Sequence, residues 1–217
     1  PWTFSRQTLD LYRRYARLHT GLFPYIHAYA HQASRTGIPI MRAMPLEFPK
    51  EPDAWGALAG HQSCFGAELL VAPVYYGFSR TRLVYLPPGR WRDFWTGEPV
   101  EGGRVVRCRA DLEQIPVFAR AGAIIPYLDP SPDTLLLATR PGVRSAGDDL
   151  RIDLYPGDDG RFQLVDGTRF AWDEAAGSLK ISTSPVDRQV SVRRVGIDPE
   201  YQRVTVGGPV AVVQWRT

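Results

Sequence analysis

The chain has 217 residues, of which 44% are hydrophobic and 12% aromatic, a composition typical of one sizeable globular domain or two small ones. It contains no run of about 20 apolar residues, so we expect no membrane span. The formal net charge is +3, but the basic residues are nearly all arginine and are scattered, and a nucleic-acid surface would need a basic stripe or patch.

The chain opens on Pro1, and no charged-then-apolar segment typical of a signal peptide follows. Because it runs straight into a helical pattern, we interpret it as a fragment whose N-terminal part is missing. The compartment cannot be read from this end of the chain, and the cytoplasm is our expectation.

Residues 5–35 carry the strongest helical pattern, with two apolar stripes at alternating steps of three and four. Two stripes make a wide apolar arc, so we expect cover on more than one side. Pro24 removes a backbone donor and its ring clashes with the preceding turn, which predicts a break near residues 21–24 with Pro24 in the first turn of a second helix. Gly37 is the predicted stop.

Residues 38–44 (IPIMRAM) are nearly all apolar and predict a strand of a parallel sheet, buried on both faces. Arg42 is the one charge in this strand, and a buried arginine needs a carboxylate or several carbonyl groups as partners. Residues 45–52 form a Pro-rich loop. Residues 53–65 are then predicted to be a helix on the spacing of their apolar residues.

Short apolar or alternating runs separated by Gly and Pro follow, which is typical of a β-sandwich or barrel. They cover residues 69–74, 82–86, 90–94, 105–109, 117–120 and 123–126. Beyond a plausible junction at Ser131 and Pro132, a second series is predicted at residues 134–138, 178–183, 189–195, 203–206 and 210–215. Asp158-Asp159-Gly160 is interpreted as a tight turn rather than a calcium loop, which would need oxygens at alternating positions.

Neither cysteines nor histidines predict a metal or redox centre. Cys64 and Cys108 have no metal-ligand spacing, and two free thiols are favoured over a disulfide. His27 and His31 lie four apart on one helical face, but no third ligand is evident. We expect no metal and no other cofactor.

Five segments of the chain carry a family resemblance. They are LHTGLFPYIHAYAHQASRTGIPIMRAM, FGAELLVAPV, RLVYLPPGRWRDFWTG, IPVFARAGAIIP and IDLYPGDDGRFQLVDGTRFAW. They resemble the C-terminal part of glycoside hydrolase family 31, the α-glucosidase and α-xylosidase family. Ala43 stands where Pro is usual, and residues 61–64 replace an acidic-Gln-aromatic run, so the subfamily is not specified.

The resemblance implies a composite α+β fold. Residues 1–67 would be the last helix-strand-helix units of a (β/α)8 TIM barrel, with residues 38–44 as its last strand. Residues 68–130 would be a proximal C-terminal β-sandwich and residues 131–217 a distal C-terminal β-domain. The two β-domains would brace the barrel and bury the outer face of the first helix.

The resemblance also implies a retaining α-glycosidase that hydrolyses α-glucosides or α-xylosides in carbohydrate metabolism. Such enzymes use two carboxylates about 5–5.5 Å apart, a nucleophile and an acid/base. In the family both are Asp on earlier barrel strands, and the nucleophile lies in a W-x-D-x-N-E type motif that this sequence lacks. We therefore expect no catalytic residue in this chain, Asp93 and Asp111 included, and no activity of the chain in isolation.

Active sites of such barrels lie at the C-terminal ends of the strands. Arg42 and Met44 are therefore the candidates for the substrate rim, although a structural ion-pair role is favoured for Arg42. The implied partners are an α-linked oligosaccharide or glycoside and the missing N-terminal barrel portion, and assembly into a homo-oligomer stays open.

Two other functions stay open on the sequence. A non-catalytic carbohydrate-binding sandwich would stack sugars on exposed Trp91, Trp95, Trp172 or Trp215, although alternating tryptophans in small β-domains are more often core. A purely structural or assembly role is the third reading. The sugar, the linkage and the choice between hydrolysis and transglycosylation depend on barrel loops outside this chain.

Overall fold

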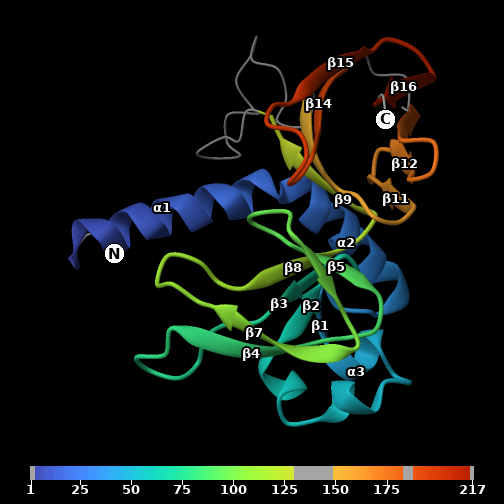
Figure 1. Ribbon diagram of the computed structural model, residues 1–217. Coiled ribbons are helices and arrows are strands. Elements are labelled where there is room, and N and C mark those ends of the chain that lie inside the picture. The colour runs from blue at the N-terminus through green and yellow to red at the C-terminus, as the bar shows by residue number, and fades with distance from the viewer. Residues whose placement is uncertain (1–2, 130–148, 183–187, 216–217) are drawn as a thin grey trace.

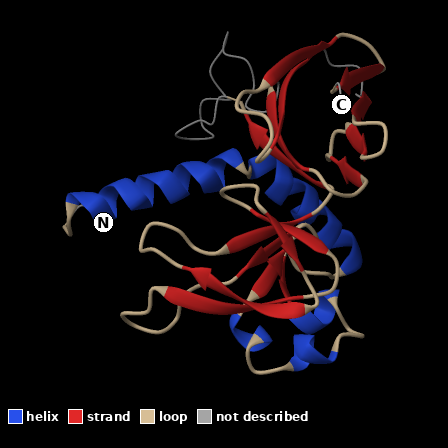
Figure 2. Cartoon of the chain, viewed as in Figure 1, coloured by secondary structure: helices blue, strands red, loops and turns tan. Residues whose placement is uncertain are grey.

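The computed structural model describes residues 3–129, 149–182 and 188–215, which are mostly β-sheet with few helices (Figures 1 and 2). Two helices, α1 (Arg6–Gly21) and α2 (Phe23–Thr36), precede all the strands. Three short helical segments follow, namely α3 (Met44–Glu47), η1 (Pro52–Trp55) and η2 (Ala59–His61). None of the helices in these ranges has the length and apolar content to cross a membrane.

The break between the two long helices lies where the sequence predicts it. The Ser5 hydroxyl caps α1 by accepting a hydrogen bond from the backbone N–H of Thr8 at 3.1 Å. Pro24 lies in the first turn of α2, where its missing N–H would have no helical partner. The helix ends at Gly37, which has a left-handed φ of 76°.

The expected cover on more than one side is present for α2 and not for α1. Tyr25 and Tyr29 of α2 are buried, whereas Gly21 is the one buried residue of α1 and Tyr12 is 59% exposed. Figure 1 shows α1 running alongside the loop between β7 and β8, and its Tyr15 hydroxyl lies 3.2 Å from the Glu113 carbonyl oxygen and 3.0 Å from the Ile115 nitrogen of that loop. The predicted burial of the first helix by the β-domains therefore holds for α2, whereas α1 contacts the first β-unit through Tyr15 and stays largely exposed.

Residues 38–65 also differ from the prediction. Strand β1 (Met41–Ala43) pairs antiparallel with β2 (Ser63–Phe65), and its burial is reversed, with Arg42 inside and Met41 67% exposed. The helix predicted over residues 53–65 is replaced by η1, η2 and β2. Glycines interrupt its apolar pattern, and pairing satisfies the backbone of residues 63–65 on both sides. A TIM-barrel fragment is not visible in the described residues.

The first β-unit is a six-stranded antiparallel sheet with a two-stranded ribbon packed on it. The sheet order is β1-β2-β3-β8-β5-β6, and the ribbon pairs β4 with β7. A buried cluster that includes Leu70, Leu86, Trp91 and Phe118 fills the space between them. The strand bounds are β3 (Leu69–Val71), β4 (Thr81–Leu86), β5 (Arg90–Asp93), β6 (Pro99–Glu101), β7 (Arg104–Arg109) and β8 (Val117–Arg120).

The second β-unit consists of two four-stranded sheets, ordered β15-β14-β10-β9 and β11-β12-β13-β16. Strand β9 pairs antiparallel with β10, so residues 123–128 join this unit rather than the strands that precede them in the sequence. The bounds are β9 (Ala123–Leu128), β10 (Leu150–Tyr155), β11 (Gly160–Gln163), β12 (Arg169–Asp173), β13 (Ser178–Ser182), β14 (Arg188–Arg194), β15 (Gln202–Val206) and β16 (Val210–Gln214).

Two expectations for this second unit need comment. The predicted strand at residues 134–138 and the junction at Ser131 and Pro132 lie outside the described residues, and the division into three domains stays a prediction. The predicted turn at residues 158–160 connects β10 to β11, but the positive φ belongs to Gly157, at 128°, rather than to Gly160.

The two β-units meet through close backbone contacts. A Cβ added to Gly97 would lie 2.5 Å from the backbone nitrogen of Gly196, and one added to Gly160 would lie 1.8 Å from the carbonyl oxygen of Gly122. The Tyr155 hydroxyl of the second unit donates to the Phe94 carbonyl of the first at 2.9 Å. This close approach lets a single hydrophobic cluster extend through both units and α2.

Candidate functional site

The structure buries Arg42, the first residue predicted to line a substrate rim. Its side chain is 5% exposed, and its Nη1 lies 2.7 Å from Glu47 Oε2. Its Nε donates to the Pro39 carbonyl at 3.1 Å, and its guanidinium lies 5.1 Å from the centre of the Tyr29 ring. The carboxylate and carbonyl partners expected for a buried arginine are confirmed.

Glu47 links Arg42 to a second arginine. Arg120 of β8 places its Nη2 2.9 Å from Glu47 Oε1, so each carboxylate oxygen accepts from a different guanidinium. The Arg120 guanidinium also lies 4.7 Å from the centre of the Phe48 ring. We call Arg42, Glu47 and Arg120 the Glu47 triad; it fastens β1 and α3 to the middle of the six-stranded sheet.

Met44 is fully buried beside Gln62 and Cys64, with its Sδ 3.6 Å from Gln62 Nε2 and 3.9 Å from Cys64 Sγ. The Gln62 amide bonds the backbone of Tyr85 in both directions, at 2.7 and 3.0 Å, which satisfies this buried side chain. Substrate-rim roles for Arg42 and Met44 stay predictions. In the structure both residues belong to the packing among β1, α3 and β2.

A second polar cluster forms around Glu68, on the turn between β2 and β3. Tyr25 and Tyr29 lie four residues apart on one face of α2, so both hydroxyls reach the same carboxyl group. The Tyr25 hydroxyl is 2.8 Å from Glu68 Oε2, and the Tyr29 hydroxyl is 2.6 Å from the same oxygen and 2.8 Å from Oε1. Gly66 permits this approach, because a Cβ there would lie 2.1 Å from the Tyr25 hydroxyl oxygen.

The contacts of Tyr25 favour a protonated Glu68 carboxyl group. The Tyr25 hydroxyl also lies 2.6 Å from the Phe65 carbonyl oxygen, which only accepts hydrogen bonds. Tyr25 has a single hydroxyl hydrogen, which can be donated to the Phe65 carbonyl oxygen or to Glu68 but not fully to both. A protonated Glu68 would donate its own hydrogen to the Tyr25 oxygen, so both contacts would be hydrogen bonds. Burial raises the pKa of Glu68 above its ordinary value, which also favours the protonated form. The hydrogen bonds from Tyr29 and Tyr25 lower this pKa, but burial is the larger effect.

Burial is also the first cause of the raised pKa values of Tyr25 and Tyr29, and the neighbouring Glu68 is the second. Both phenols therefore stay protonated as hydrogen-bond donors over the ordinary pH range.

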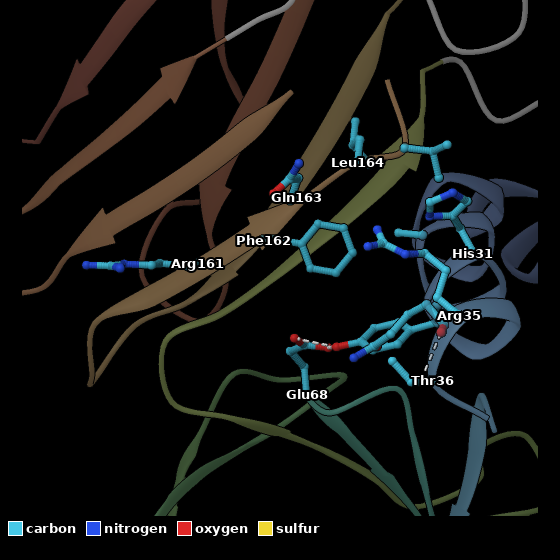
Figure 3. Close-up of a pocket in the computed structure, with 12 residues that line it drawn as sticks. His31, Arg35, Thr36, Glu68, Arg161, Phe162, Gln163 and Leu164 are labelled. Carbon is cyan, nitrogen blue, oxygen red and sulfur yellow. Dashed lines mark hydrogen bonds between the residues drawn. The ribbon is translucent and has the colours of Figure 1, made fainter. Parts of the chain in front are cut away.

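Glu68 and Tyr29 line a cavity of about 630 Å³ between α2 and β11, and Figure 3 shows Glu68 on the side opposite Leu164. Phe162 of β11 lines the cavity and stacks on the Tyr25 ring at 5.5 Å. Polar side chains from both walls complete the lining, including His31, Arg35 and Gln163. The cavity lining thus combines hydrogen-bonding groups with aromatic rings, an arrangement that can bind a small polar molecule.

The remaining chemical candidates from the sequence are structural. The rings of Trp91, Trp172 and Trp215 are buried at 2, 4 and 4% exposure, so they form core and cannot stack on a sugar, while the Trp95 indole donates to the Ile115 carbonyl at 2.8 Å. The Asp93 carboxylate accepts from the backbone N–H groups of Trp95 and Thr96, as a turn residue does.

Cys64 and Cys108 are free thiols, as the sequence favours. Burial raises the pKa of Cys64 to about 12 and that of Cys108 to about 11, which makes both poor nucleophiles. Among the described residues no group of three or more His, Cys, Asp or Glu side chains could hold a metal ion. The His27 ring stacks on Phe23 at 5.3 Å.

Reasoning from the sequence missed the Glu47 triad and the Glu68 cluster. One available signal was the four-residue spacing of Tyr25 and Tyr29, which places two hydroxyls at one point. The other was Glu68 itself, a single acid that directly precedes a buried apolar run. Neither signal identifies the partner, because each lies about forty residues away in the chain.

Most of this chain is similar to proteins of known family. Residues 37–125 match the family described as the glycosyl hydrolase family 31 C-terminal domain. An isomaltosyltransferase of Sporosarcina globispora is 33% identical over 190 residues, which are 85% of this chain and 16% of that protein. An alpha-xylosidase of Saccharolobus solfataricus is 31% identical over 182 residues, 83% of this chain and 24% of that protein.

A solved structure extends the similarity to three dimensions. The family 31 alpha-xylosidase of Xanthomonas citri superposes with a TM-score of 0.78 at 29% identity, over 92% of this chain and 24% of that one. The chain thus spans a quarter or less of the length of each of these three proteins. From these matches, this chain belongs to glycosyl hydrolase family 31 and carries the family's C-terminal domain.

Proposed function

We propose that the chain is the C-terminal portion of a retaining α-glycosidase that acts on α-linked glucosides or xylosides. The nucleophile and the acid/base would then lie on barrel strands N-terminal to Pro1. The observation that carries the proposal is the superposition over 92% of this chain and 24% of the X. citri alpha-xylosidase, together with the family match over residues 37–125.

The surface of β1 and α1 supports a place beside a further part of the same enzyme. Strand β1 has its charged residue, Arg42, turned inward, while Met41 is 67% exposed. Tyr12 on α1 and Ile38 ahead of β1 are exposed as well, at 59 and 37%. Apolar groups that face outward from several elements are typical of surfaces that another protein part covers.

Within such an enzyme this chain would act as a brace. The Glu47 triad holds β1 and α3 to β8, and the Glu68 cluster holds α2 to the same sheet. Phe162 adds the second β-unit to the contact through its stacking on Tyr25. Chemistry that needs groups held within about 0.5 Å of their positions benefits from this kind of rigid support.

Two measurements test the proposal. The purified 217-residue chain should not hydrolyse aryl α-glucosides or aryl α-xylosides, and the coding sequence directly upstream of Pro1 should encode an in-frame W-x-D-x-N-E motif. Turnover by the chain itself that disappears when one of its own Asp or Glu residues is replaced would overturn the assignment. An upstream sequence without an acidic barrel motif would do the same.

A further inference from the structure

A cluster of aromatic rings lies exposed on one loop between β3 and β4. Tyr75, Tyr76 and Phe78 are 41, 68 and 108% exposed, whereas most of the large aromatic side chains of the two β-units are buried. Phe78 has a φ of 61° and is the one residue other than glycine with a positive φ in the described ranges. A bulky residue held in the left-handed region is strained, and such strain is concentrated at functional sites.

The rings of this loop are held in place from one side. The Tyr75 ring stacks on the His61 ring with centres 4.0 Å apart, and the Tyr76 ring lies 4.2 Å from Tyr75 at an angle of 42°. The Arg82 guanidinium lies 4.7 Å from the centre of Tyr75 and donates from Nη2 to the His61 carbonyl at 3.1 Å. A ring that is already ordered loses little conformational entropy when a ligand binds.

Arg82 supports the Tyr75 ring from within the fold. Its side chain is 5% exposed, and its Nε is buried without a hydrogen-bond partner in the structure. Its cation adds attraction to the aromatic ring that it supports.

The size of the exposed patch formed by Tyr76 and Phe78 distinguishes a small ligand from a protein partner. A stable protein interface buries about 1,200–2,000 Å² in total, and a fully buried aromatic side chain supplies about 150–250 Å². Two protruding rings, Tyr76 and Phe78, therefore match a ligand of one or two sugar rings rather than a folded partner. The C–H faces of a pyranose pack on aromatic rings, while the Tyr76 hydroxyl and the His61 imidazole can bond sugar hydroxyls at the edge.

We propose that His61, Tyr75, Tyr76 and Phe78 form a binding platform for an α-linked gluco-oligosaccharide. The choice of sugar rests on the proposed glycosidase function, and the binding itself needs no catalytic residue. Tyr76 and Phe78 contact the pyranose faces, and Tyr75, which contacts both His61 and Arg82, fixes the position of Tyr76.

The test is affinity electrophoresis of the 217-residue chain in native gels that contain soluble α-glucan, with titration by maltohexaose for the dissociation constant. We expect retardation of the native chain, and binding about tenfold weaker in Tyr76→Ala and in Phe78→Gly. Phe78→Gly is chosen because glycine adopts a φ of 61° without strain, so this variant should melt at a higher temperature while it loses the sugar. Tyr12→Ala, which removes an exposed ring from α1, is the matched control and should bind normally.

The platform is wrong if the native chain migrates unchanged in α-glucan gels, or if Tyr76→Ala and Phe78→Gly bind as well as the native chain. A dissociation constant for β-linked cellohexaose equal to that for maltohexaose would overturn the α-linked class. None of these outcomes bears on the upstream acidic motif, so a failed platform is distinguishable from a failed glycosidase assignment.

Discussion

At the scale of single residues, the carboxylate of Glu47 holds two guanidinium groups that belong to different elements. Arg42 is 5% exposed, so its charge depends on this partner for compensation, whereas a pair such as Arg109 with Asp111 lies in solvent at 83 and 49% exposure. The two pairs have similar distances, 2.7 and 3.0 Å, and they differ in burial.

Replacing Glu47 by Gln should therefore lower the free energy of unfolding by about 3 kcal/mol, because it leaves a buried charge without compensation. Urea titration followed by fluorescence measures the change. The control, Asp111→Asn, should lower it by less than about 1 kcal/mol, because water screens that pair. Equal losses in the two variants would contradict the burial argument.

Glu68 predicts a pH dependence of stability. Folding raises the pKa of this carboxyl through burial, so folding favours its protonated form. The stabilisation is complete below the unfolded-state pKa of about 4.3 and is lost as the pH rises through the higher folded-state pKa. Glu68→Gln keeps a neutral side chain of the same shape, so the stability of this variant minus that of the native chain should increase over this interval and then level off.

Melting temperatures at a series of pH values from 4 upward test this prediction. Glu98→Gln, at an exposed side chain, controls for the loss of a negative charge. A Glu68→Gln difference that stays constant or shrinks with rising pH would show that Glu68 is ionised in the folded protein.

At the scale of elements, two glycines with similar backbone angles separate steric crowding from backbone strain. Gly37 ends α2 with a φ of 76°, and a Cβ added there would meet no atom within 4 Å. Gly66 follows β2 with a φ of 65° and lies against the rings of Tyr25 and Tyr29. Both positions need the left-handed conformation, and only Gly66 also needs the absence of a side chain.

Gly37→Ala should lower the free energy of unfolding by about 1–2 kcal/mol, the penalty for a side chain in the left-handed region. Gly66→Ala should lose a further 1–3 kcal/mol or so, because its Cβ would lie 2.1 Å from the Tyr25 hydroxyl oxygen and 2.5 Å from a ring carbon of Tyr29. Chemical denaturation of the two variants side by side gives both values. Identical losses would mean that α2 shifts freely on the sheet.

At the scale of the whole molecule, outward-facing apolar groups should govern how the isolated chain behaves. Phe4, Tyr12, Met41 and Leu46 are each more than half exposed, although this chain has two extensive cores elsewhere. We expect the purified chain to self-associate and to bind a hydrophobic dye, and the combined variant Tyr12→Lys and Met41→Lys to do both less. A native chain that elutes as a 24.3 kDa monomer, melts cooperatively and binds no dye would contradict a covered surface on α1 and β1.

Some parts of the fold were predictable because their causes are local. The break before Pro24 and the stop at Gly37 follow from the ring and from the missing Cβ of single residues. Most strands between residues 69 and 128 follow from apolar runs cut by Gly and Pro, although β6 (Pro99–Glu101) was not predicted. The partner of Arg42 was predictable as a class, a carboxylate, and not as Glu47.

The failures share a non-local cause. The apolar spacing over residues 53–65 fits a helix, yet Ser63–Phe65 forms a strand because β1 and β3 lie on either side of it. A run of apolar residues does not show which side chains of β1 point into the core. A shift of one residue in the strand pairing would exchange its buried and exposed faces. The exposure of Tyr76 and the burial of Trp91, Trp172 and Trp215 depend on the same packing.

By itself the sequence determined the break and the end of the two long helices, the approximate position of many of the strands, and to which family the chain belongs. The helix ends and strand positions depend on residues that are neighbours in the sequence, and the family is identified from sequence motifs in a fixed order. Only the tertiary structure decided that Glu68 meets Tyr25 and Tyr29, that β9 joins the second unit, and that Tyr75, Tyr76 and Phe78 face solvent. These contacts depend on which segments pack together, and the packing is set by the free energy of the whole folded chain rather than by any single segment.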